Sequence, residues 1–104
     1  MHGNFNTMLN RKQHDRTVDA RGWLLWEDDD VSATITVTVI QNTTTAAGDP
    51  IECSPHDDTW KVDVASGNGA FMRGSASGNA RAMVTKTDGT TVEQYWESPP
   101  LSLH

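Results

Sequence analysis

The stretch Val31–Gln41, VSATITVTVIQ, decides the fold class of this chain. Apolar and polar residues alternate along it, and the apolar positions are Val31, Ala33, Ile35, Val37 and Val39. A period of two residues is typical of an antiparallel strand that buries one face and leaves the other in water. The stretch therefore predicts a half-buried strand with a row of Thr side chains on its wet face.

Two further stretches have the composition of strands. Trp60–Ala65 places Trp60, Val62 and Val64 on one face, with charged residues between them. Ala20–Trp26 is apolar on both faces, which predicts a central strand or one covered by the N-terminal segment. No window of about a dozen residues shows the helical period, so we expect a β protein.

A hairpin is predicted near the C-terminus. Two β-rich runs, Arg81–Thr87 and Thr90–Trp96, flank Asp88-Gly89, a pair that favours a two-residue type I′ turn. With Thr87 opposite Thr90, the predicted register places Val84 opposite Glu93, Ala82 opposite Tyr95 and Arg81 opposite Trp96.

The whole chain has the size of one all-β domain. Its 104 residues, 36% of them hydrophobic, include about seven predicted strands with turn signals every 8–12 residues. This spacing predicts an antiparallel β-sandwich, immunoglobulin-like or similar, over residues 18–104, in which Pro99-Pro100 ends the sheet. Residues 1–17 are mostly polar and predict a flexible N-terminal arm. The only cysteine, Cys53, excludes an internal disulfide.

The charge distribution argues against nucleic-acid and membrane partners. Residues 1–21 carry four Lys or Arg and two Asp, so the rest of the chain carries four basic and twelve acidic groups, within a net charge of −6. An acidic surface repels phosphate backbones and anionic lipids. No apolar stretch approaches the roughly 20 residues needed to cross a bilayer, so we expect a soluble protein.

Two acidic clusters are candidates for a cation site. Glu27-Asp28-Asp29-Asp30 follows one predicted strand, and His56-Asp57-Asp58 precedes another. If consecutive strands reverse direction, both clusters lie at the same end of the sandwich. Oxygen ligands in flexible loops suit Ca²⁺, and the predicted ligands are Asp28, Asp29, Asp30, His56, Asp57 and Asp58. The alternative is a pair of solvated acidic turns, because the EF-hand spacing is absent.

No motif for catalysis or for a resident cofactor is present. The sequence lacks GxSxG, a P-loop, GxGxxG and paired zinc-ligand spacings. We therefore expect a non-enzymatic binding or interaction module that contacts a protein or glycan partner through residues 27–30 and 55–59. Two alternatives stay open. One is a Ca²⁺-dependent carbohydrate-binding domain that stacks sugars on Trp26 or Trp60. The other is a subunit of a homo-oligomeric assembly whose N-terminal arm reaches a neighbour.

Overall fold

A computed structural model describes all 104 residues and consists of strands and connecting loops, without a helix. The ten strands are β1 (His2–Phe5), β2 (Met8–Lys12), β3 (Thr17–Leu25), β4 (Asp30–Gln41), β5 (Thr44–Ala47), β6 (Ile51–Cys53), β7 (Thr59–Ser66), β8 (Gly74–Lys86), β9 (Thr91–Glu97) and β10 (Leu101–Leu103). The structure thus has no helix of the length and apolarity that a membrane crossing requires.

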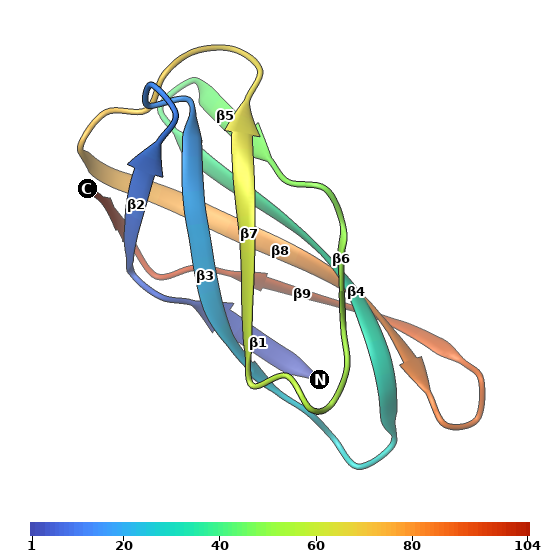
Figure 1. Cartoon of the computed structure of the whole chain (residues 1–104). Coiled ribbons are helices and arrows are strands. Elements are labelled where there is room, and N and C mark those ends of the chain that lie inside the picture. The colour runs from blue at the N-terminus through green and yellow to red at the C-terminus, as the bar shows by residue number, and fades with distance from the viewer.

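Seven of the strands close into a barrel (Figure 1). Their order is β4-β5-β7-β3-β2-β10-β8, and β8 pairs with β4 to complete the circle. The other three strands extend this wall: β6 pairs with β4, β9 with β8 and β1 with β3. The all-β prediction is confirmed, but a closed barrel takes the place of two clearly separate sheets. Closure comes from β10, which lies parallel to β2 and antiparallel to β8.

The strand that closes the barrel follows two prolines. The sequence predicts that Pro99-Pro100 ends the sheet, but β10 forms directly after them. Leu101 and Leu103 are buried and Ser102 is exposed, which is the alternation of a strand with one buried face. Neither proline lies inside the ladder, so their missing backbone N–H groups are not needed there.

The N-terminal segment belongs to the barrel. The sequence predicts a flexible arm over residues 1–17, whereas the structure places residues 2–5 and 8–12 in β1 and β2. Met1, Phe5 and Leu9 are buried in the core. The burial of these few apolar side chains anchors the segment, while polar residues between them face water. Residues 1–17 are therefore not free to act as an arm that reaches a neighbouring subunit.

β4 confirms the strand predicted from its alternation, except at its first residues. The buried apolar positions are Ala33, Ile35, Val37 and Val39. Val31 was predicted on the same face but is 46% exposed. A β-bulge explains the difference, because Asp30 lies opposite Lys86 and Ser32 opposite Thr85, which leaves Val31 without a partner.

The predicted hairpin forms from β8 and β9, but its register differs by one residue. Trp96 lies opposite Ala80, whereas the prediction pairs it with Arg81. Gly89 is the one residue of the turn with positive φ, at 85°, which fits a three-residue loop; a type I′ turn needs two such residues. A shift of one residue exchanges the two faces of a strand. Trp96 is therefore buried, and Tyr95 faces outward.

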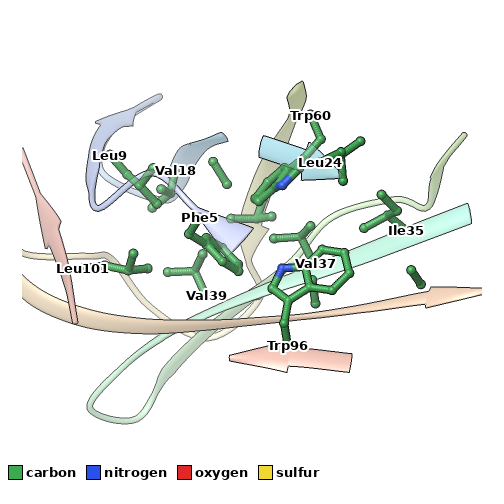
Figure 2. Packing of buried hydrophobic residues seen from close by; sticks show 14 of the residues in the cluster. Phe5, Leu9, Val18, Leu24, Ile35, Val37, Val39, Trp60, Trp96 and Leu101 are labelled. Carbon is green, nitrogen blue, oxygen red and sulfur yellow. The ribbon is translucent and has the colours of Figure 1, made fainter. Parts of the chain in front are cut away.

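Aromatic and aliphatic side chains fill the barrel interior (Figure 2). Trp60 and Trp96 point inward from opposite sides in this view. The rings of Phe5 and Trp60 meet edge to face, with 4.9 Å between their centroids. Trp60 Nε1 donates a hydrogen bond to the carbonyl oxygen of Asn4 at 3.2 Å. Gly22 makes this arrangement possible, because a Cβ there would overlap both the Trp60 indole and that carbonyl oxygen.

Candidate functional site

The acidic loop between β3 and β4 has two cations of the chain beside it, Lys86 and the α-amino group. Lys86 Nζ lies 2.6 Å from Asp30 Oδ1, and 3.1 Å from both Glu27 Oε2 and Asp29 Oδ1. The α-amino group of Met1 lies 2.9 Å from Asp30 Oδ2. The side chain of Asp30 has no exposed surface, so these cations balance a charge that water does not reach.

The ionisation of this cluster follows from these contacts. Burial by itself raises the pKa of Asp30, but hydrogen bonds from Lys86, the Glu27 backbone N–H and the α-amino group outweigh it and lower the pKa to about 2. The hydrogen bond to Asp30 raises the pKa of Lys86, with help from Glu27 and Asp29. The two groups therefore stay charged together at neutral pH.

Only part of the predicted cation site comes together around these groups. Carboxylate oxygens of Glu27, Asp29 and Asp30 lie within 4.8 Å of one another, and Lys86 Nζ contacts all three residues. A divalent cation would have to displace this ammonium group. Asp28 is exposed and outside the cluster, as are His56, Asp57 and Asp58 on the second loop.

The two acidic loops nevertheless touch, at the end of the barrel where the sequence predicts them to meet. Trp26 Nε1 donates to the Asp57 carbonyl oxygen at 2.7 Å, and Leu24 N donates to that of Asp58 at 2.8 Å. The Asp57 carboxylate accepts from Ser54 N at 2.8 Å and so faces its own loop.

Of the two aromatic residues predicted to stack on a sugar, one is buried and the other is half-buried. Trp60 is only 3% exposed and belongs to the core. Trp26 is half-buried and packs against the edge of the same core, and its indole N–H is used by the Asp57 contact. Stacking on Trp60 would require the loop end to rearrange, whereas Trp26 has only the exposed part of its side chain to offer.

Two hollows flank Cys53 beside the second acidic loop. They have volumes of about 290 and 390 Å³, and both are lined by Glu52, Cys53 and Asp57. The larger one also reaches Trp60 and Lys61 on β7. Burial raises the pKa of the Cys53 thiol, and the nearby Asp57 carboxylate raises it further, so the thiol is protonated at neutral pH.

The surface around these hollows carries negative charge that the chain does not balance. Residues 49–58 contain Asp49, Glu52, Asp57 and Asp58 and no Lys or Arg. None of these four carboxylates takes part in an ion pair of the structure. The second acidic loop thus differs from the first, whose carboxylates already hold Lys86.

A second hollowed surface lies on the outer face of β4, β8 and β9. Two hollows of about 300 and 240 Å³ share Asn79 and Tyr95, and the first is also lined by Thr36, Thr38 and Arg81. Tyr95 is 51% exposed, and its hydroxyl lies 3.3 Å from Glu97 Oε1. The sequence does not predict this site, because the predicted hairpin register puts Tyr95 and Arg81 on opposite faces.

Comparisons of the chain with protein-family models, with curated proteins and with solved structures give no match.

Proposed function

We propose that the chain is a non-enzymatic binding module that recognises a cationic partner through the acidic surface around β6. The observation that carries this proposal is the pair of hollows at Glu52, Cys53 and Asp57, whose carboxylates form no ion pair within the chain; Lys61 is the one Lys or Arg that lines either hollow. Unbalanced carboxylates attract basic side chains, speed their encounter and select against acidic partners.

The chemistry of Cys53 supports a binding role for this surface. A nucleophilic cysteine needs a lowered pKa and access to substrate, whereas Cys53 is buried and its pKa is raised. Glu52 and Asp57 also lie beside hydroxyl-bearing residues of β4 and of the loop, which suit hydrogen bonding without bond breakage.

The test uses a fluorescently labelled lysine octapeptide and an equally labelled glutamate octapeptide. Anisotropy titrations at about 0.01 M and 0.15 M ionic strength, where the Debye lengths are about 30 and 8 Å, separate electrostatic from apolar binding. We expect the lysine peptide to bind more weakly at the higher ionic strength, and the glutamate peptide not to bind. Glu52→Gln lowers the affinity, whereas Glu97→Gln, an equal charge change on the Tyr95 surface, leaves it unchanged. Equal effects of the two variants contradict the proposed location.

A second candidate function is sugar binding on the outer face of β4, β8 and β9. The exposed ring of Tyr95 lies beside an amide, a guanidinium group and two Thr hydroxyls, a combination that suits the apolar face and the hydroxyl groups of a sugar. This candidate replaces the predicted stacking on Trp26 and Trp60 and needs no Ca²⁺. A glycan array probed with and without EDTA tests it, and Tyr95→Ala abolishes binding that occurs on this face.

A further inference from the structure

One edge of β7 has no strand beside it over most of its length. Its first edge pairs with β3 from Thr59 to Ala65, but its second edge meets β5 only at Ala65 and Ser66. Hydrogen bonds from Ser66 N to Arg16 O and from Leu24 N to Asp58 O fix which residues of β7 face β3. By the alternation of an antiparallel ladder, the N–H and C=O groups of Thr59, Lys61 and Asp63 point away from β3. A Cβ at Gly48 would lie 3.3 Å from the Asp63 carbonyl oxygen, so Gly48 covers that end and the open groups are those of Thr59 and Lys61.

The chain that follows β5 separates from β7 at a bulge. β5 and β6 follow one another along the same edge of β4, where Gly48 N bonds to Val37 O and Ile51 lies opposite Ile35. One extra residue is accommodated between these two positions, at Asp49-Pro50. Pro50 has no N–H to offer a ladder. β6 pairs with β4 alone, and the hollow of about 390 Å³ is lined from both β6 and β7.

This opening, which we call the β6–β7 seam, has an apolar floor and an acidic rim. Ile51 is the partly exposed apolar residue of this floor, Cys53 and Trp60 lie buried beneath it, and Glu52 and Asp57 contribute negative charge. Lys61 is the one basic residue that lines it. An extended chain with alternating side chains would place one set on the floor and the other at the rim.

We propose that the β6–β7 seam binds an extended peptide segment of a partner protein, in which apolar and basic residues alternate, by adding it to β7 as a strand. This inference rests on the proposed function, a module for cationic partners. Backbone hydrogen bonds to Thr59 and Lys61 supply the pairing, the apolar residues of the segment cover the floor, and its basic residues meet Glu52 and Asp57. The added strand continues the line of β5, which already pairs with the far end of β7.

The experiment uses a labelled seven-residue peptide that alternates Lys and Val, with both ends blocked. Two further versions of this peptide carry backbone N-methyl groups. The first is methylated at every Lys and the second at every Val, so each keeps its side chains and charge but loses the N–H donors on one edge of the strand. We expect the parent peptide to bind the full chain and at least one methylated version to bind about tenfold more weakly, roughly 1.4 kcal/mol. Amide exchange at Thr59 and Lys61, followed by NMR, slows when the parent peptide is bound.

The outcomes separate the inference from the proposed function. If both methylated peptides bind as tightly as the parent, strand addition is refuted while cationic recognition stands. If neither the parent nor the lysine octapeptide binds, both fail. Exchange protection on β9 with none on β7 also overturns the inference, because β9 is another exposed strand of the wall.

Two variants add a test from the protein side. Lys61→Pro removes one open N–H at a position that does not donate to β3, and we expect it to weaken binding of the parent peptide about tenfold. Circular dichroism checks that this variant folds. Glu52→Gln leaves the backbone unchanged, and we expect it to weaken binding of the parent peptide by less than Lys61→Pro does. Glu97→Gln is the matched control.

Discussion

Replacing Lys86 with Met tests how the first acidic loop is held. The pKa of Asp30 falls from 3.8 to about 2, and at 1.36 kcal/mol per unit this corresponds to about 2 kcal/mol of stability shared by its partners. Loss of one partner of a buried ion pair costs about 3–5 kcal/mol. Asp30 keeps the Met1 α-amino group at 2.9 Å. We therefore expect Lys86→Met to lower the free energy of unfolding at pH 7 by about 2–3 kcal/mol.

Urea unfolding followed by tryptophan fluorescence measures this loss, since Trp60 and Trp96 are buried and become exposed. For a domain of this size the same loss lowers the melting temperature by roughly 10–20 °C. The matched control is Lys12→Met, which removes a 2.8 Å ion pair with Asp63 between two exposed side chains. Such pairs contribute about 0.2–1 kcal/mol. A loss in Lys86→Met no larger than in the control refutes the reasoning.

The pH dependence gives an independent check. The folded-state pKa of Asp30 lies below its unfolded value, so its stabilisation is complete above about pH 4 and is lost as the pH falls through about 2. The difference between the wild type and Lys86→Met should therefore shrink over that range. A difference that stays constant from pH 5 to pH 2 contradicts the assignment to Asp30.

Three other perturbations have expected outcomes. Millimolar Ca²⁺ leaves the melting temperature of the wild type unchanged in a thermal scan against EDTA, because Lys86 Nζ already lies among the clustered carboxylates and contacts all three; a rise of several degrees would restore the predicted cation site. Gly22→Ala lowers the urea midpoint by the equivalent of at least ~2 kcal/mol, since its Cβ overlaps the Trp60 indole, and an unchanged midpoint would mean that the ring moves freely. Gly89→Ala costs about 1 kcal/mol in the same assay, because φ is 85° there; a stabilised variant would argue for a different turn.

The parts of the fold that the sequence predicts are those set by local alternation. β4 and β7 follow the period of two, since β7 buries one face and β4 does so from Ala33 onward, after the bulge at Val31. β1 and β2 were missed because each contributes only one buried apolar residue between polar ones. The hairpin register follows a three-residue loop in which only Gly89 has positive φ, and beside this turn Thr87 N bonds to the Asp29 carbonyl oxygen, a contact distant in sequence. No local pattern encodes that contact.

The candidate site was predicted in outline and not in its chemistry. The meeting of residues 27–30 with residues 55–59 follows from strand reversal alone. The partner of the first loop, Lys86, lies on β8, more than fifty positions along the chain from Asp30. The opening beside β7 does have a local signal, the run Gly48-Asp49-Pro50, which favours a bulge. That signal shows where pairing stops, but not which carboxylates gather there.

The pairing of β2 with β10 has a consequence for the kinetics of folding. Met8 lies opposite Ser102, so the barrel closes only when segments from near both ends of the chain have found each other. Closing so large a loop costs conformational entropy before the strand contacts that offset it have formed, and this slows folding. All-β domains rich in such distant pairings fold in milliseconds to seconds. Until closure, β8 and β2 each present a bare edge to other chains. Refolding should therefore depend on protein concentration, with aggregation competing at the step in which β10 docks.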